Sequence, residues 1–304
     1  MRVLLTGATG FIGSHLLIRL VKMNVPVAIV LREGAKTWRI DEVIDKVFVI
    51  RGDLSDPDTI QQPIITFAPD VVIHLAWYGV ENRYRNEYQQ LSINLLHITN
   101  LLQVIERTNV KKLIGFGSQG EYGPQNVPID ERIVPQPTTL YGVAKLCAYN
   151  IFELFCRQRS MDFSWVRLFS IYGPKDNDSW LIPSIITQLL AQKSPELTEG
   201  RQTWDFLYID DAVDAIISIL QSKKSNGIFN LGSGTSPTIR QTAEKIRDAI
   251  NPAIQLRFGL IPYRSDQVMF LQANIDRLKN ITGWTPQVSL EQGIQRTIAW
   301  YKLT

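Results

Sequence analysis

The sequence predicts an α/β fold in which a doubly wound parallel sheet is covered by helices on both faces. Short apolar runs alternate with longer segments of helical periodicity from residue 1 onward, and such alternation is typical of parallel sheets. The first apolar run ends in a glycine-rich turn. With 304 residues, 45% hydrophobic and 20% charged, the chain has the composition of a globular protein with a sizeable core.

The expected strands and helices follow one another in a regular order. The apolar runs predict strands at residues 2–7, 25–31, 47–53, 70–77, 111–118 and 163–173, and the helical segments include residues 13–23, 89–107 and 140–158. After Pro174 this rhythm weakens, and short elements rich in proline and asparagine dominate. We therefore expect a larger domain that contains the sheet at 1–172 with 206–228, and a smaller, interleaved domain at 173–205 with 229–304.

The charge balance and the rare residue types exclude several classes of protein. The chain carries 32 basic and 29 acidic residues, a net charge of +3, which is too balanced to favour nucleic acid or a membrane surface as a partner. No apolar run reaches the ~18 residues of a transmembrane helix, and the first residues do not look like a secretion signal. Cys147 and Cys156 should lie on opposite sides of one helix, and His15, His74 and His97 have no metal-ligand spacing. We expect a reduced, cytoplasmic protein without a metal.

The turn after the first strand predicts a dinucleotide site. In LLTGATGFIGSHL, Gly7, Gly10 and Gly13 have the spacing GxxGxxG. Glycine permits a positive φ and a close approach of the backbone to a pyrophosphate, and the following helix directs its free N–H groups at the phosphates. Because the motif joins a first strand to an amphipathic helix and opens a repeated βαβ pattern, it indicates a Rossmann-type fold.

The residues after the second strand bear on the choice of cofactor. A carboxylate at this place reads the ribose of NAD, whereas an arginine favours the 2′-phosphate of NADP. The strand ends VAIVLREGAK, so Arg32 is near the reading position, with Lys36 behind it and Glu33 as the one nearby carboxylate. We expect NADP(H), with NAD(H) possible if Arg32 is only an exposed strand-end charge. Asp53 follows the third strand and either accepts the adenine amino group or caps a turn.

Two later segments predict an acid–base centre. Tyr141 and Lys145 are four residues apart, so they lie on one face of a helix. Free tyrosine has a pKa near ~10, and a neighbouring ammonium group and a cationic nicotinamide would favour the phenolate. Tyr141 could then act as general acid or base. Ser118 ends the fifth strand, where parallel sheets bind ligands, and its hydroxyl could bond a substrate oxygen.

With these pieces in view, the chain resembles the extended short-chain dehydrogenase/reductase family, the NAD-dependent epimerase/dehydratase group. The matching segments are TGATGFIG, GDL, HLA, GSQGEYG, YGVAK, RLFSIYGP, DFLYIDDAVDAI, FNLGSG and GWTPQVSLEQGI, and they run from residue 4 to about 294. The resemblance implies that Ser118, Tyr141 and Lys145 are catalytic, whereas Tyr122 is a loop tyrosine. It implies cofactor contacts from the loops after the first, third and fourth strands and from the catalytic helix, to which the position after the second strand adds Arg32. The expected set is Gly7, Thr9, Gly10, Phe11, Ile12, Gly13, Arg32, Asp53, Leu54, Leu75, Ala76, Tyr141 and Lys145.

The resemblance also implies a sugar linked to a nucleoside diphosphate as substrate and leaves three reactions to compare. A dehydratase of the family needs an Asp-Glu pair after the loop Ser or Thr, and this chain has Gln119 and Gly120 there, with Glu121 expected to point elsewhere. We favour a reductase that uses NADPH to reduce a 4-keto-6-deoxy sugar nucleotide in deoxysugar biosynthesis. An epimerase is the alternative, and other carbonyl or alcohol substrates or a catalytically inactive, NADP-sensing protein stay open.

The substrate side departs from the family pattern. Ser170 replaces an Asn that contacts the phosphate in many members, and Trp204 replaces an Arg, whereas Arg264 matches the later diphosphate-binding arginine. Trp204 could stack on the substrate or fill an interface, and Trp77 and Tyr78 could face the nicotinamide or pack in the core. The resemblance also implies a homodimer formed by residues 90–107 and 140–158. The apolar residues expected to support it are Leu91, Leu95, Ile98, Leu102, Tyr149, Phe152 and Phe155.

Overall fold

A computed structural model describes residues 1–303 and divides the chain into two compact units. The first unit contains residues 1–123, 133–168 and 216–229, and the second contains 124–132, 169–215 and 230–304. The interleaving resembles the expected division, but the boundaries differ from it. Residues 124–132, 169–172 and 206–215 belong to the second unit, although the sequence pattern assigned them to the larger, nucleotide-binding domain.

A seven-stranded sheet of Rossmann type forms the centre of the first unit. Its strands are β1 (Val3–Thr6), β2 (Val27–Leu31), β3 (Phe48–Arg51), β4 (Val71–His74), β5 (Lys112–Ser118), β6 (Asp162–Leu168) and β11 (Gly227–Leu231). Their spatial order is β11-β6-β5-β4-β1-β2-β3, and the pairs from β3 to β6 are parallel. The order reverses between β1 and β4, which is where sheets of this kind bind their ligands.

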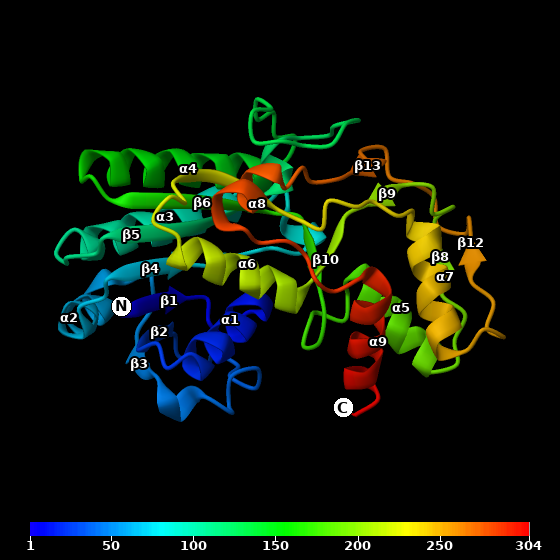
Figure 1. Cartoon of the computed structure of the whole chain (residues 1–304), viewed down its shortest axis with the longest axis horizontal. Coiled ribbons are helices and arrows are strands. Elements are labelled where there is room, and N and C mark those ends of the chain that lie inside the picture. Colours follow the sequence, from blue (N-terminus) through cyan, green and yellow to red (C-terminus); the bar gives the residue numbers. More distant parts are fainter. Residues whose placement is uncertain (304) are drawn as a thin grey trace. The chain divides into compact units, whose positions relative to one another are not determined.

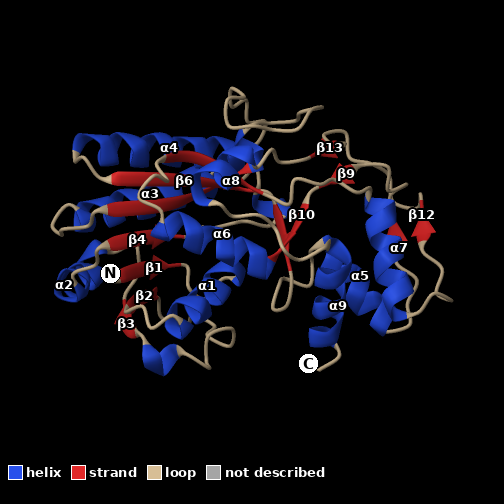
Figure 2. Cartoon of the chain, in the orientation of Figure 1, coloured by secondary structure: helices blue, strands red, loops and turns tan. Residues whose placement is uncertain are grey.

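Helices flank this sheet (Figures 1 and 2), and their apolar side chains bury it. The helices α2 (Pro57–Phe67), α3 (Gln89–Ile105) and α4 (Leu140–Gln158) form one core cluster with β1–β6, and α1 (Phe11–Lys22) packs on β1 and β2. The cluster includes Ile60 of α2, Leu101 of α3 and Phe152 of α4, each 0% exposed. The helix α4 has the bounds that its sequence predicts, because Thr139 caps it by accepting a hydrogen bond from the Gly142 N–H over 3.2 Å.

The segment predicted as one strand at 163–173 is two strands, and this prediction was wrong. The strand β6 ends at Leu168, and β7 (Ser170–Tyr172) pairs instead with β10 (Phe206–Tyr208) in a separate parallel ribbon of the second unit. Both strands are apolar, so hydrophobic pattern alone could not show the break between them. The chain therefore changes units directly after β6.

The second unit is built from short strands and helices. Two further ribbons pair β8 (Glu196–Leu197) with β12 (Arg257–Phe258), and β9 (Thr203–Trp204) with β13 (Phe270–Leu271). The helices α5 (Leu181–Leu190), α7 (Ile239–Ile250) and α9 (Leu290–Tyr301) pack on one another, and α8 (Asp276–Thr282) follows β13. The helix α6 (Ile209–Gln221) begins in this unit and ends in the first.

Candidate active site

The glycines of the β1–α1 turn are required by close backbone packing. Gly7 has φ +74°, and a Cβ there would lie 2.6 Å from the backbone nitrogen of Ala76. A Cβ on Gly13 would overlap the Gly7 carbonyl oxygen. Gly10 is the exposed N-cap of the 12-residue helix α1, and no side chain caps the N–H groups at its start. The turn thus has the backbone cradle that a pyrophosphate group needs.

The cradle contains the other cofactor residues that the motif implies. Thr9, Phe11 and Ile12 lie in the turn and the first turn of α1, and all three are partly exposed. Leu75 and Ala76 follow β4, where the Leu75 N–H donates to the Thr6 carbonyl oxygen over 3.2 Å. The ends of β1 and β4 are therefore held together directly under the glycine turn.

His74 also connects the ends of β1 and β4. Its Nδ1 lies 2.8 Å from the Thr6 hydroxyl oxygen, and that oxygen also accepts a hydrogen bond from the Ala76 N–H over 3.3 Å. Burial, together with the charges of Lys145 and His97, lowers the pKa of His74 to about 3. His74 is therefore a neutral, buried hydrogen-bonding residue, and no metal-binding role is needed to explain it.

The residues expected to read the adenosine end are more exposed. Arg32 and Lys36 follow β2 and are both exposed, whereas Leu54 after β3 is 6% exposed. Asp53 accepts a hydrogen bond from the Ser55 N–H over 2.8 Å, so it does cap a turn. Burial alone would raise its pKa, but the bonds from Ser55 and the charges of His97 and Arg32 lower it overall. Arg32 thus lies close enough to act on Asp53 electrostatically.

Ser118 and Tyr141 come together at the carboxyl end of β5 and the start of α4. Their side chains are hydrogen-bonded, and the Ser118 Oγ also accepts from the Gly120 N–H over 3.1 Å. Burial raises the pKa of Tyr141, while the Ser118 hydroxyl and the charge of Arg85 lower it and Glu121 raises it. In the free chain the phenolate is therefore not favoured, in contrast to the expectation from the nearby lysine, because burial outweighs the two favourable contacts.

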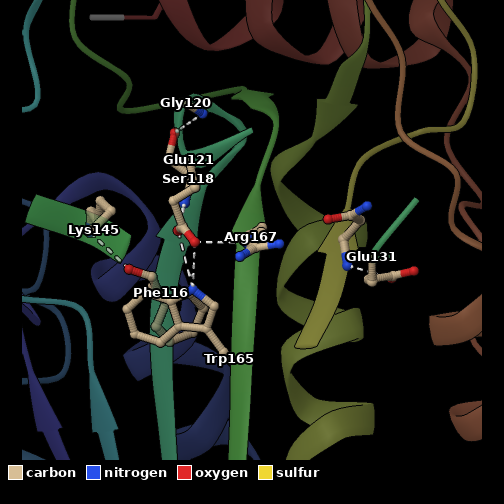
Figure 3. A network of polar contacts seen from close by, with 9 residues as sticks. Phe116, Ser118, Gly120, Glu121, Glu131, Lys145, Trp165 and Arg167 are labelled. Carbon is tan, nitrogen blue, oxygen red and sulfur yellow. Dashed lines mark hydrogen bonds and ion pairs between the residues drawn. The ribbon is translucent and has the colours of Figure 1, made fainter. Parts of the chain in front are cut away.

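Lys145 is buried and contacts Phe116 and Trp77 as well as Tyr141. It is 5% exposed, and its Nζ donates to the Phe116 carbonyl oxygen over 2.8 Å (Figure 3). The Nζ lies 3.5 Å from the centroid of the Trp77 ring but 5.8 Å from that of Tyr141. Burial, partly opposed by the charge of Glu121, lowers the pKa of Lys145 to about 7. Trp77 thus faces Lys145 and also packs against the core cluster, and its contact with the nicotinamide stays a prediction.

Trp77 is itself held in place by polar side chains of α3. Its indole Nε1 donates to the Gln90 Oε1 over 3.0 Å, and Gln90, which is 0% exposed, donates to the Tyr84 carbonyl oxygen over 3.1 Å. Asn94 accepts a hydrogen bond from the Tyr78 N–H over 2.7 Å. Sequence reasoning missed this support, and the four-residue spacing of Gln90 and Asn94 on one face of α3 was the signal for it.

The structure adds a buried ion pair that sequence reasoning did not foresee. Glu121 and Arg167 are 0% and 1% exposed, and Arg167 Nε donates to Glu121 Oε2 over 2.7 Å. Glu121 directs its carboxylate at Trp165 and Arg167 of β6, as Figure 3 shows, and its Oε1 also accepts a hydrogen bond from the Ser118 N–H. The signal in the sequence was an arginine in the apolar run of β6, because a charge in such a run requires a partner.

Two of the residues implied on the substrate side contact each other within the second unit. The Trp204 Nε1 donates to the Ser170 Oγ over 2.6 Å, so the two departures from the family pattern form one pair. Arg264 is exposed and lies 3.4 Å from the Asp266 carboxylate. Sequence reasoning named these residues singly and could not show that Ser170 and Trp204 act together.

Other kinds of site have no support in residues 1–303. These residues contain no group of three or more His, Cys, Asp or Glu that could hold a metal ion. None of the helices in this part of the chain is long and apolar enough to cross a membrane. Cys147 and Cys156 are both free thiols, as their places on α4 predicted.

The chain is similar to several known proteins over nearly its whole length. The GDP-6-deoxy-D-mannose reductase of Pseudomonas aeruginosa is 27% identical over 313 residues, covering 98% of this chain and 96% of its own. The UDP-glucose 4-epimerase of Mycolicibacterium smegmatis is 26% identical over 312 residues, covering 99% of each. The crystal structure of the Thermotoga maritima UDP-glucose 4-epimerase with UDP-glucose matches with a TM-score of 0.91 at 24% identity, covering 100% of this chain and 99% of that one.

The sequence model described as the NAD dependent epimerase/dehydratase family matches residues 3–232, from the first strand of the sheet to the end of its last. The match includes the glycine turn, the end of β5 and the start of α4. The glycine cradle fits the dinucleotide that this family uses. The chain therefore belongs to the NAD dependent epimerase/dehydratase family, the extended short-chain dehydrogenases/reductases.

Proposed function

We propose that this enzyme reduces a 4-keto-6-deoxy sugar linked to a nucleoside diphosphate, with NADPH as the reductant. The observation that carries this proposal is the position of Gly120. A Cβ on Gly120 would lie 3.5 Å from the Ser118 Oγ and 3.7 Å from a ring carbon of Tyr141. A carboxylic acid at position 120 would reach Ser118 and Tyr141, but this chain has glycine there. The elimination of water is therefore disfavoured. Reduction of a ketone needs no carboxylic acid at this position.

The reaction needs a proton donor and a hydrogen bond to the ketone oxygen. When bound, the nicotinamide supplies the hydride. The Tyr141 hydroxyl donates its proton to the carbonyl oxygen, and the raised pKa of Tyr141, caused by burial, keeps it protonated before the reaction. Ser118 holds the same oxygen with its hydroxyl, whose proton turns from Tyr141 to the substrate while its Oγ keeps the bond from the Gly120 N–H.

Lys145 orients the reacting groups. Its Nζ is fixed between the Phe116 carbonyl oxygen and the Trp77 ring, so it can bond the nicotinamide ribose with little loss of side-chain freedom. The turn residues from Gly7 to Gly13 hold the pyrophosphate, and Asp53 and Leu54 border the adenine. Arg32 is proposed to bind the 2′-phosphate of NADP(H), which its exposed position after β2 permits.

The substrate nucleotide is assigned to residues of the second unit. Ser170 and Trp204 form a hydrogen-bonded pair that can contact the sugar nucleotide, and the exposed guanidinium of Arg264 can bind a diphosphate oxygen. The similarity to a GDP-6-deoxy-D-mannose reductase supports a deoxysugar substrate.

Nucleotide-sugar epimerization with a retained cofactor is the second candidate. It is supported by the similarity to a UDP-glucose 4-epimerase over nearly the whole of both chains. Ser118, Tyr141 and Lys145 would serve both reactions, since an epimerase also moves a proton and a hydride at one carbon. The two differ in whether the nicotinamide is consumed.

The deciding experiment supplies three kinds of substrate to the purified enzyme with NADPH or NADH. These are a 4-keto-6-deoxy sugar nucleotide, the corresponding intact hexose nucleotide, and a UDP-hexose. We expect oxidation of NADPH in step with the ketone and no reaction with the other two. Interconversion of two sugar nucleotides without net use of cofactor would establish the epimerase instead, and dehydration of the intact hexose would contradict both.

We also propose a homodimer formed by α3 and α4, but with a different set of contact residues. Ile98, Leu102 and Phe152 are buried in this chain's own core, so the expectation that they support a dimer was wrong. Partly exposed residues remain on these helices, namely Leu91, Leu95, Tyr149 and Phe155, and Leu96 and Leu154 are 48% and 45% exposed. Light scattering at micromolar concentration should give a dimer, and Leu154→Glu should weaken it. A monomeric wild type would contradict this proposal.

A further inference from the structure

Glu121 is a fully buried carboxylate that the proposed reaction does not use directly. It is 0% exposed and accepts hydrogen bonds from two side chains of β6. Arg167 Nε donates to Oε2 over 2.7 Å, and Trp165 Nε1 lies 3.1 Å from Oε1 and 3.2 Å from Oε2 (Figure 3). Moving two charges out of water is costly, so a buried ion pair often adds little to the stability of a fold. A contribution to stability alone therefore does not explain why this pair is present.

The strand β5 leaves space for the Glu121–Arg167 pair because it has a glycine beside it. Gly117 of β5 lies opposite Arg167 in the register of β5 and β6. A Cβ on Gly117 would overlap both the Glu121 Oε1 and the Trp165 Nε1. Any larger residue at position 117 would therefore push the Glu121 carboxylate away from the end of β5. The contacts of Glu121 with Trp165 and Arg167 thus depend on this glycine.

The same carboxylate reaches the catalytic loop. The Ser118 N–H donates to the Glu121 Oε1 over 2.9 Å, and the Ser118 Oγ accepts from the Gly120 N–H over 3.1 Å, which completes a reciprocal capping box. The Ser118 hydroxyl is in turn hydrogen-bonded to Tyr141. A continuous series of polar contacts thus runs from Arg167 through Glu121 to the hydroxyl pair that handles the proton.

We propose that Glu121 is a positioning residue whose carboxylate, anchored by Arg167 and Trp165, holds Ser118 in register with Tyr141 and sets the charge around the proton donor. This inference rests on the proposed acid–base role of Ser118 and Tyr141. The groups facing Glu121 are Arg167 on β6 and Tyr141, Lys145 and Tyr149 on α4, and Arg85 also acts on Tyr141.

The charge of Glu121 changes the pKa values of Tyr141 and Lys145 in the same direction. Burial raises the pKa of Tyr141 and lowers that of Lys145, and the charge of Glu121 raises both. Removing this charge should therefore move both pKa values downward. The limb of a pH–rate profile that reports Tyr141 should shift to lower pH, whichever direction of proton transfer limits the rate.

The test uses two double variants, because Glu121 alone cannot be replaced without leaving a buried arginine charge. Glu121→Leu with Arg167→Met removes the ion pair and the acceptor for the Ser118 N–H. Glu121→Gln with Arg167→Met removes the same charges but keeps an amide oxygen that can accept that bond. Circular dichroism and thermal melting establish that both fold. Glu131→Gln is the matched control, since Glu131 also has a pKa raised by burial and accepts a backbone N–H, that of Asn230, over 2.8 Å.

We expect the leucine variant to lose roughly 30- to 100-fold in kcat with KM for substrate and cofactor little changed, because misplacing a reacting group by about 1 Å has such an effect. The glutamine variant should recover most of this loss, and Glu131→Gln should behave as wild type. Equal kcat values in the two double variants, or losses found in KM alone, would overturn the positioning role.

A direct titration tests the electrostatic part without turnover. The tyrosines are labelled with ¹³C at Cζ, and the Tyr141 resonance is assigned by its loss in Tyr141→Phe. Its pKa should be lower in both double variants than in wild type, because Glu121, and not Arg167, acts on Tyr141 through its charge. An unchanged pKa would refute the charge coupling. Because this measurement needs no substrate, it stays decisive even if wild type fails to reduce the ketone and the proposed function falls.

Discussion

The two ends of the dinucleotide site in the first unit are built in different ways. At the carboxyl end of β5 and the start of α4, Ser118 and Lys145 are 8% and 5% exposed and already bonded to their neighbours. At the carboxyl end of β2, Arg32 and Lys36 are exposed, and Trp38 is 46% exposed. Both sets follow strands of one parallel sheet, yet only one set is held rigidly.

The difference reflects what each end has to do. Proton transfer depends on distances of a few tenths of an ångström, so its groups gain from being fixed before the substrate arrives. Recognition of a phosphate by an arginine tolerates a flexible side chain, because the attraction between the charges brings the two together. Substitutions in the buried set should therefore alter rate and stability, whereas those in the exposed set should alter the choice of ligand.

The largest effect should come from Tyr141→Phe, which removes the transferable proton from the buried set. The ring and its packing stay, so we expect kcat to fall by about 10²–10⁴-fold while the affinity for cofactor is kept. Steady-state kinetics and a cofactor titration by fluorescence check the two parts. Residual activity within about tenfold of wild type would exclude Tyr141 as the proton donor.

The next effect concerns stability, through His74. Burial lowers the pKa of His74 to about 3 from 6.5, so below 6.5 the unfolded chain takes up a proton that the folded chain refuses. The free energy of unfolding should thus decrease as pH falls from 6.5 towards 3, by on the order of a few kcal/mol from this group. In His74→Asn, which cannot titrate, urea unfolding should show a weaker dependence over this range. An identical dependence in both proteins would refute the assignment.

A smaller effect is expected from Arg32→Ala in the exposed set. Only NADPH carries the 2′-phosphate, so the variant should bind NADPH about 10- to 100-fold more weakly while NADH binding changes little. Dissociation constants for both cofactors, measured at two salt concentrations, check this. Lys36→Ala is the comparison variant for a nearby exposed charge. Equal losses for NADPH and NADH would mean that Arg32 does not read the phosphate.

The smallest effect should come from Trp77, which faces the Lys145 ammonium at 3.5 Å. An aromatic face stabilises a desolvated cation by ~0.5–2 kcal/mol. Trp77→Leu should therefore lower the pKa of Lys145 below about 7, whereas Trp77→Phe should keep most of the effect. A titration of ¹³C-labelled lysine measures this pKa directly. If both variants leave it unchanged, Trp77 only fills space.

Much of the first unit could be predicted from the sequence because its signals are local. The glycine spacing in the first turn depends on positive φ and close backbone approach, which few other residues permit, and Gly7 does show both. The four-residue spacing of Tyr141 and Lys145 places both on one face of α4 by helical geometry alone. The alternation of apolar runs likewise predicted the parallel sheet.

Other features depended on contacts between distant segments. The break between β6 and β7 follows from the pairing of β7 with β10, more than 30 residues further along the chain. Periodicity could not distinguish the buried Ile98 and Phe152 from residues on an outer face, because burial depends on which neighbours pack against a helix.

The sequence by itself determined which chemical groups this protein has: a dinucleotide turn, a serine, a tyrosine and a lysine in the pattern of its family, and no acid pair beside the serine. Only the tertiary structure decided how those groups are charged and held. Glu121 and Arg167 are 46 residues apart and meet because β5 and β6 are neighbours in the sheet. Burial then raises the pKa of Tyr141 and lowers that of Lys145, since desolvation acts on groups only after the chain has closed around them.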